Sequence, residues 1–334
     1  MLNQQNETDI RNPRRRGCLI WLGWIAALII GLMVLGATYE SRAETSDAKA
    51  YPAPGQLVDV DGHRLHINCT GTGSPTVVID SGMGDWSASW SSWVQPEVAK
   101  TTRVCTYDRA GYGWSEAGSR PPTVEQFAKE LHTLVQNAGI PGPYVLVGHS
   151  LGGFTVRLFV QKYAADVAGV VLIESMTPRQ ARPSATGTPP AATPASGFSI
   201  LTFPARIGLV RLLAGPLGLT SDLSPEVQPA YTAFSVTPRS FQTMLDEGAG
   251  MPEGFIQADA VKTFGDIPLI VLTGKLNTTP REWQEWQTEL LQLSSNSQQL
   301  FAEHSGHNIQ IEQPEAAVAA IIQMVQQVRQ TVKK

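Results

Sequence analysis

The chain has 334 residues, of which 42% are hydrophobic and 16% are charged. This composition is typical of a globular protein and is long enough for one large α/β domain or two smaller ones. The formal net charge of −4 at pH 7 gives no indication of a nucleic-acid partner.

The amino end contains an apolar segment, Cys18 to Thr38, without a charged residue. As a helix, about 21 residues cover roughly 31 Å, close to the thickness of a hydrocarbon core. Four basic residues lie just before it: Arg11, Arg14, Arg15 and Arg16. The positive-inside rule then predicts a cytoplasmic amino terminus and an exported remainder. A cleaved signal peptide is the alternative, which the long apolar run and the poor cleavage sequence at Ser41 to Ala43 disfavour.

Short apolar runs typical of buried strands recur through the rest of the chain. They lie at residues 56–60, 63–69, 76–80, 103–107, 144–148, 169–174, 268–274 and 298–303. Helix-like stretches separate most of them, at 123–138, 153–163, 281–293 and 314–331. Alternating strands and helices predict a largely parallel sheet with right-handed crossovers.

The alternation stops between Thr177 and Phe255. The first part, 177–198, is rich in Pro, Ala, Ser and Thr, and 200–219 is apolar enough for one or two short packed helices. A long insertion after a strand favours a lid over the active site, with a poorly ordered excursion as the alternative.

The domain boundaries follow from these patterns. We predict a basic cytoplasmic tail, a transmembrane anchor, a linker, an α/β core in two pieces and a cap inserted between them. The corresponding ranges are 1–16, 17–39, 40–55, 56–178 with 255–334, and 179–254.

The motif Gly148-His149-Ser150-Leu151-Gly152 joins an apolar strand to a helical run. A tight turn there would project the hydroxyl of Ser150, and glycines on both sides would let strand and helix approach closely. Ser150 as an ordinary helix N-cap is the alternative, but it does not explain the two glycines. We therefore predict that Ser150 is a nucleophile.

A serine nucleophile needs a base, a group that orients the base, and donors for the oxyanion. His307 follows Ser305-Gly306 in a loop before the last helix and is the predicted base; nearby His304 is expected to lie outside the site. The backbone N–H groups of Leu151 and Met83 are the predicted oxyanion donors. An ordinary glycine turn is the alternative for the segment around Met83.

These motifs resemble the α/β-hydrolase superfamily, in particular its branch of esterases and lipases with a serine nucleophile. The resemblance rests on four segments in the family's order: SGMGDWSASW, YDRAGYGWSE, GHSLGG and HSGHNIQIEQPE. It covers nearly all of residues 56–334 apart from the insertion. It implies an eight-stranded, mostly parallel sheet with helices on both faces and a cap after strand six. A serine at the elbow argues against the superfamily's haloalkane dehalogenases and epoxide hydrolases, which have aspartate there.

The sequence departs from the family at the catalytic acid. The usual aspartate position after strand seven holds Asn277, which carries no negative charge. Some members take the acid from the end of strand six, where this chain has Glu174. We predict Glu174 as the acid, with Asn277 as a neutral orienting group and a structural role for Glu174 as the alternatives.

The resemblance also bears on the cysteines. By sequence alone Cys69 and Cys105 could be two buried thiols or a disulfide. In this superfamily the strands that they end are neighbours, which favours a Cys69–Cys105 disulfide in an exported domain. Asp108 and Arg109 are expected to hold their own loop by local hydrogen bonds.

Together these features predict a membrane-anchored, extracytoplasmic serine hydrolase that cleaves carboxylic esters through an acyl-enzyme. A small ester or amide substrate and the lipid bilayer are the predicted partners, with no metal or organic cofactor. A lactonase or a prolyl-type aminopeptidase on the same triad is one alternative. The aminopeptidase would bind an ammonium through acidic residues of the cap. The available ones are Asp222, Glu226, Asp246, Glu247 and Glu253. A non-catalytic ligand-binding protein is the other alternative, which Asn277 favours.

Overall fold

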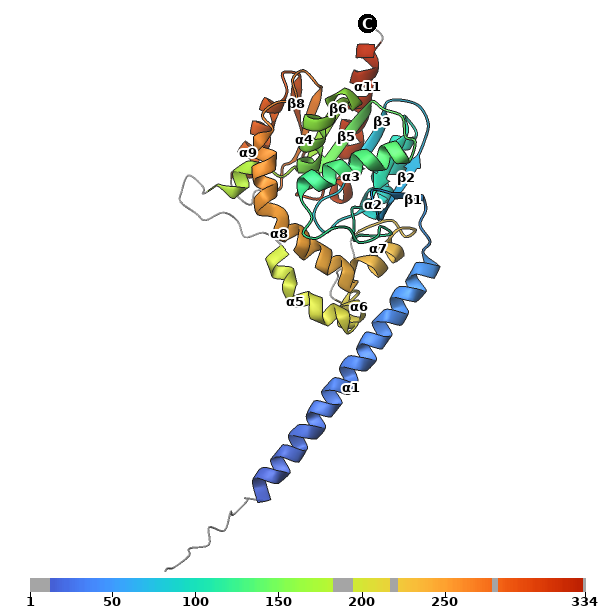
Figure 1. The fold of residues 1–334 in the computed structure, drawn as a ribbon. Helices are drawn as coiled ribbons and strands as arrows, with labels where there is room; N and C mark the ends of the chain where they lie inside the picture. Colours follow the sequence, from blue (N-terminus) through green and yellow to red (C-terminus); the bar gives the residue numbers. More distant parts are fainter. Residues whose placement is uncertain (1–12, 183–194, 217–221, 278–281, 333–334) are drawn as a thin grey trace, which may run out of the picture.

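The computed structural model describes residues 13–182, 195–216, 222–277 and 282–332. Its centre is the predicted eight-stranded, mostly parallel sheet (Figure 1), and its strands lie in the order β1-β2-β4-β3-β5-β6-β7-β8. The strands are β1 (Gln56–Asp59), β2 (Arg64–Thr70), β3 (Thr76–Asp80), β4 (Val104–Tyr107), β5 (Tyr144–His149), β6 (Val167–Ile173), β7 (Leu269–Gly274) and β8 (Ser297–Ala302).

The strand order places the carboxyl ends of the central strands together. β1 pairs antiparallel with β2, and β2 pairs antiparallel with β4, whereas all the other neighbours are parallel. After β3 the chain adds β4 on one side and then returns to place β5 on the other. In an open α/β sheet, ligands bind in the crevice that this reversal creates.

The sheet is buried on both faces, which explains its continuously apolar strands. In β5, Tyr144 and Leu146 pack into the core on one face, while Val145 and Val147 pack into the core on the other. The helices that cover these faces are α2 (Ser87–Ala99), α3 (Val124–Asn137), α4 (Gly152–Tyr163), α9 (Trp283–Glu289), α10 (Ile309–Glu312) and α11 (Pro314–Val332). Short 3₁₀ turns, η1 (Ala164–Asp166), η2 (Pro178–Ala181) and η3 (Leu290–Leu293), adjoin them.

The insertion between β6 and β7 forms a helical cap. Its helices are α5 (Ala195–Arg206), α6 (Leu209–Leu213), α7 (Gln228–Ser235) and α8 (Pro238–Ala260). A small core of Ala205, Val210, Ala214, Val236 and Phe241 joins them. Much of the Pro, Ala, Ser and Thr-rich stretch predicted at 177–198 lies outside the described residues.

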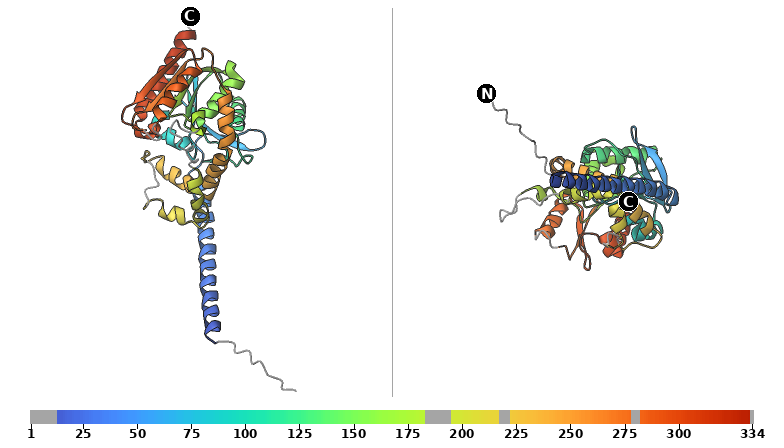
Figure 2. Two further views of the ribbon diagram at one scale, coloured as in Figure 1. Left: turned by 90° about the vertical axis from the view of Figure 1, so that its left-hand side faces the viewer. Right: turned by 90° about the horizontal axis from the view of Figure 1, so that it is seen from below.

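The amino-terminal helix α1 (Pro13–Ala50) is longer than the predicted anchor. It extends through most of the predicted linker, where Arg211 of α6 pairs with Glu40 and Asp47. The part Ile20–Ala50 is a candidate membrane span, because it contains an apolar window that is not buried against the rest of the described chain. Figure 2 shows α1 projecting away from the globular part.

Candidate active site

The turn around Ser150 has the geometry of a nucleophile elbow. Ser150 adopts φ of 51°, in the left-handed region that non-glycine residues rarely occupy. A Cβ on Gly148 would lie 2.7 Å from the carbonyl oxygen of Gly152, and one on Gly152 would lie 2.4 Å from that of Asp80. The two glycines are therefore required by close backbone contacts between β5, α4 and β3.

Glu174 occupies the corresponding position at the end of β6. It also adopts a positive φ, 44°, and its side chain is fully buried. Its Oε1 accepts from the backbone N–H of Gly274 at 2.7 Å, and its Oε2 lies 3.2 Å from Nδ1 of His307. The amide of Asn277 donates to the same Oε2 at 2.5 Å. Asn277 thus contacts the carboxylate and helps to fix its orientation.

His307 lies in the loop between β8 and α10 and is the partner of Glu174. A carboxylate on Nδ1 fixes the tautomer that presents an unprotonated Nε2 to a nucleophile. The ring remains 39% exposed and contacts Trp283 edge-on, with the ring centroids 5.8 Å apart. Within the described residues, Ser150 and His307 share no direct hydrogen bond. Such bonds are often long in unliganded enzymes and shorten when substrate binds.

His149, the residue before Ser150, positions the backbone of the His307 loop. Its Nε2 lies 2.9 Å from the carbonyl oxygen of His307, and a carbonyl can only accept, so Nε2 carries the proton. Burial, reinforced by the nearby His307, lowers the pKa of His149 to about 3. His149 is therefore neutral at physiological pH and acts as a hydrogen-bond donor that holds the loop.

The segment Ser81 to Asp85 forms a turn above Ser150. A Cβ on Gly82 would approach the Cβ of Ser150 to 3.2 Å, so only glycine permits this proximity. Within the described part of the chain, the N–H groups of Met83 and Leu151 donate to no other group. Two unsatisfied amides beside a serine hydroxyl form the arrangement expected of an oxyanion hole.

Arg109 holds the turn from Ser81 to Asp85, which we call the oxyanion turn, by hydrogen bonds to its backbone. Its guanidinium donates to the carbonyl oxygens of Ser81 at 2.6 Å and Gly82 at 2.7 Å. It also pairs with Asp80 at 2.7 Å and with Glu247 of α8 at 2.8 Å, all within a buried cluster. Burial alone would lower the pKa of Arg109, but the carboxylates of Glu247 and Asp80 raise it well above its ordinary value.

The expectation of purely local bonding therefore needs correction for Arg109. Arg109 links the oxyanion turn to the cap, because it binds the turn and Glu247 of α8 at the same time. A second link runs through Tyr112, whose hydroxyl donates to Glu247 and accepts from the N–H of Gly84. No sequence pattern indicates a pair of residues 138 positions apart. A buried arginine is usually paired with a carboxylate. That general rule was the one indication that Arg109 would have an acidic partner.

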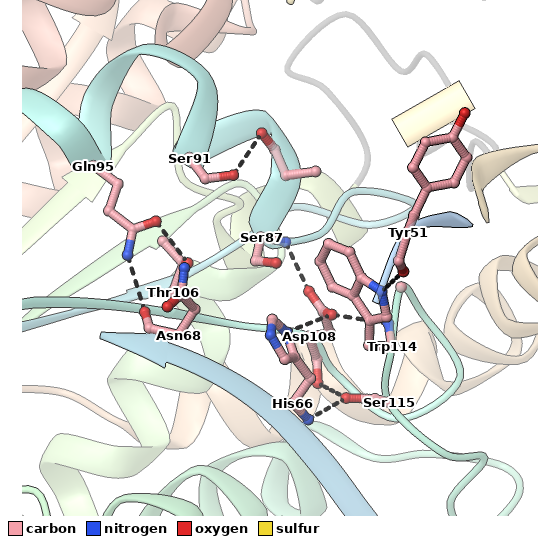
Figure 3. A network of polar contacts seen from close by, with 12 residues as sticks. Tyr51, His66, Asn68, Ser87, Ser91, Gln95, Thr106, Asp108, Trp114 and Ser115 are labelled. Carbon is pink, nitrogen blue, oxygen red and sulfur yellow. Dashed lines mark hydrogen bonds and ion pairs between the residues drawn. The ribbon is translucent and has the colours of Figure 1, made fainter. Parts of the chain in front are cut away.

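Asp108, in contrast, does organise its own loop and the strands beside it. Figure 3 shows its carboxylate at the centre of a polar network. Asp108 accepts from the N–H groups of Ser87 and Trp114 and from Nδ1 of His66. The indole N–H of Trp114 donates to the carbonyl oxygen of Tyr51 at 2.8 Å, which ties the end of α1 to the core.

The two cysteines lie opposite each other in the β2/β4 register and are joined by a disulfide. This crosslink sits on the side of the sheet away from Glu174 and His307, since β2 and β4 precede β3 in the strand order. It therefore crosslinks β2 to β4 at a distance from these two side chains.

Curated relatives of the chain are similar over part or most of its length. It is 25% identical to the uncharacterized protein YqjL of Bacillus subtilis over 78% of this chain and 88% of YqjL. It is 26% identical to YbdG of the same organism over 47% of this chain, and the match spans only 48% of YbdG. An uncharacterized vacuolar membrane protein of Saccharomyces cerevisiae is 30% identical over 34% of this chain and 20% of its own length.

Solved structures share the fold at lower identity. A thermophilic esterase from Thermogutta terrifontis aligns with a TM-score of 0.62 and 23% identity over 82% of this chain and 98% of its own. The enol-lactonase of Burkholderia xenovorans aligns with a TM-score of 0.56 and 19% identity over 81% of this chain and 100% of its own. The model of the alpha/beta hydrolase family matches residues 71–321, three quarters of the sequence. The chain belongs to the α/β hydrolase family.

Proposed function

We propose that this protein is a membrane-anchored serine hydrolase that cleaves carboxylic esters with Ser150, His307 and Glu174. The observation that carries the proposal is the fully buried Glu174 carboxylate, which lies 3.2 Å from Nδ1 of His307. The ring of His307 in turn lies 4.9 Å, centroid to centroid, from that of His149, the residue before the nucleophile elbow. This arrangement of acid, base and projected serine is what acyl transfer requires.

The reaction follows from the roles of these groups. Nε2 of His307 accepts the proton of Ser150 as the oxygen attacks the ester carbonyl, and Glu174 stabilises the imidazolium that forms. The N–H groups of Met83 and Leu151 donate to the oxyanion. The intermediate collapses when His307 protonates the departing alkoxide. Water then attacks the acyl-enzyme with His307 as base, which releases the carboxylic acid and restores Ser150.

The membrane position is part of the same proposal. The basic residues before the apolar part of α1 favour a cytoplasmic amino terminus, and the Cys69–Cys105 disulfide suits an oxidising compartment outside the cytosol. Relatives named as membrane proteins support the anchor.

The cap gives less support to an aminopeptidase. Glu247 is already paired with Arg109 and Tyr112, and Asp246 pairs with Arg120 at 3.0 Å. Asp222, Glu226 and Glu253 are exposed at the protein surface. An aminopeptidase would need a buried carboxylate that is free to bind a substrate ammonium, and none of these five residues is both buried and unpaired.

The experiment is hydrolysis of a chain-length series of p-nitrophenyl esters by the full-length protein in detergent. We expect Ser150→Ala and His307→Ala each to lower kcat by about 10⁴-fold or more. The exposed neighbour His304 provides the matched control, and His304→Ala should retain wild-type kcat. If folded wild type and Ser150→Ala hydrolyse every ester equally slowly, the esterase proposal is wrong and ligand binding becomes the better hypothesis.

A further inference from the structure

The cap exposes an apolar face on α5 and α6. The large side chains on this face are 39% to 75% exposed. They are Ile200, Phe203, Leu209, Leu212 and Leu213, which we call the α5–α6 face. The opposite side of the same helices is also apolar and is buried in the cap through Ala205, Val210 and Ala214. A helix pair that is apolar on both sides requires a second apolar environment.

The α5–α6 face begins where α1 touches the cap. A Cβ on Gly36 would lie 2.4 Å from the carbonyl oxygen of Ile207, so the two backbones are in direct contact. The ring of Tyr39 packs on Gly208, and Arg211 forms ion pairs with Glu40 and Asp47 that are largely shielded from solvent. These contacts, together with the Trp114–Tyr51 hydrogen bond, hold the globular part against α1 at several points.

The position of Gly36 along α1 sets the depth of this contact. The uncharged apolar segment ends at Thr38, two residues beyond Gly36. At about 1.5 Å per residue, Gly36 lies roughly 3 Å inside the end of a span centred on this segment. Before this point α1 exposes its own large apolar side chains, including Trp24, Leu28 and Leu35. Figures 1 and 2 show α5 and α6 as the part of the globular domain nearest to this portion of α1.

We infer that the α5–α6 face is embedded in the headgroup and acyl boundary of the bilayer that α1 spans. The apolar surface of the cap is continuous with that of α1 at Ile207 and Gly36, so lipid that surrounds α1 also contacts α5 and α6. Interfacial helices are buried ~5–10 Å into this boundary, and exposed Arg206 at the end of α5 is suited to lipid phosphates.

This inference rests on the proposed function and narrows its substrate. α5 packs on α8, and α8 contacts the oxyanion turn through Met244, which lies against Gly84, and reaches it through the Glu247–Arg109 pair. The cap over the site is thus the same element that contacts the membrane. Esters whose acyl chains partition into the bilayer are therefore the substrate class that reaches Ser150 most directly.

The test places a probe on the face in the full-length chain. Cys18→Ala leaves only the disulfide-bonded cysteines, and an environment-sensitive fluorophore is attached through Phe203→Cys or Leu212→Cys. Ile256→Cys is the matched control, because Ile256 is 66% exposed near the end of α8 that Figure 1 shows farthest from α1. Leu28→Cys reports on the anchor itself. Each protein is reconstituted in nanodiscs of phosphatidylcholine brominated on its acyl chains.

We expect the Phe203→Cys and Leu212→Cys probes to shift to the blue and to lose fluorescence in brominated lipid, while the Ile256→Cys probe does neither. Quenching of Leu28→Cys together with an unquenched Phe203→Cys would overturn the inference and leave the anchor intact. An unquenched Leu28→Cys would overturn the anchor and the inference with it.

A kinetic arm separates the substrate class from the chemistry. Phe203→Ser with Leu212→Ser should lower hydrolysis of a long-chain ester dissolved in the bilayer more than hydrolysis of a soluble short-chain ester, whereas Ile256→Ser should change neither. Equal losses on both esters would contradict the bilayer-dissolved substrate class. If Ser150→Ala matches wild type on both esters, the esterase proposal fails while the quenching result still decides the membrane contact.

Discussion

The edge of the sheet and the cap hold their parts of the site by different means. At the sheet edge, Ser150 and Glu174 follow β5 and β6 directly, and their positions come from parallel strand register and close backbone contacts. In the cap, α8 reaches the site through side chains: Glu247 pairs with Arg109 and accepts from Tyr112, and Met244 lies against Gly84. The backbone therefore positions the proposed catalytic groups, while side-chain contacts hold the cap against the turn beneath it.

This difference predicts which substitutions should change catalysis and which should change stability. A substitution of a triad side chain removes a chemical role from a framework that persists. A substitution of Glu247 leaves buried hydrogen-bond donors without their acceptor, which is destabilising.

After Ser150 and His307, the largest effect should come from Glu174, the proposed acid of the triad. Glu174→Gln keeps the size of the side chain but removes the charge that stabilises the His307 imidazolium, so kcat should fall by about 10²–10⁴-fold with little change in Tm. Asn277→Ala removes only a hydrogen bond to Glu174 and should cost about tenfold or less. Ester hydrolysis and thermal unfolding of the two variants measure this; similar losses in both would favour Asn277 as the orienting group.

The cap should be most sensitive at Glu247. Glu247→Ala removes the shared acceptor of the Arg109 guanidinium and the Tyr112 hydroxyl, and each buried polar group left without a partner costs about 1–3 kcal/mol of unfolding free energy. The oxyanion turn should loosen as well, so kcat should fall more than KM rises. Chemical denaturation and steady-state kinetics are the measurements. Exposed Glu253 on the same helix is the control, and a Glu253→Ala effect of equal size would refute the assignment.

The disulfide should stabilise the folded state and have little effect on the rate of ester hydrolysis. It closes a loop with a sequence separation of 36 residues, for which the chain-entropy estimate is about 4 kcal/mol. Replacing both cysteines, Cys69→Ala with Cys105→Ala, should lower the midpoint of denaturation while kcat at low temperature stays near wild type. Loss of kcat in the folded double variant would show that the crosslink also supports the site.

The smallest effect concerns Asp85, at the end of the oxyanion turn. Burial raises its pKa to about 6 from 3.8, so the folded state binds a proton that the unfolded state has released between these values. This group therefore lowers stability as pH rises from about 4 to above 6, by at most roughly 3 kcal/mol. Asp85→Asn should flatten that part of the unfolding profile, whereas exposed Glu97→Gln should leave the profile unchanged.

The strands, the cap and the position of Glu174 could be predicted because they depend on residues close together in the sequence. Apolar runs, the glycine spacing around Ser150 and the resemblance together predicted the strands, the cap and Glu174 at a strand end. The Arg109–Glu247 pair has no local pattern, because its members lie on separate elements 138 residues apart. The polar segment that resembles a linker lies in α1, where Glu40 pairs with Arg211, 171 residues away, and no local pattern indicates that contact.

The positive φ of Ser150 has a practical consequence. A non-glycine residue in this conformation costs about 1–2 kcal/mol, so the wild-type chain is less stable at the residue that we propose as the nucleophile. Glycine relieves that strain and removes the hydroxyl in a single substitution. Ser150→Gly is then an inactive protein at least as stable as its parent, and it would retain an uncleaved ester long enough for the bound molecule to be recovered and identified.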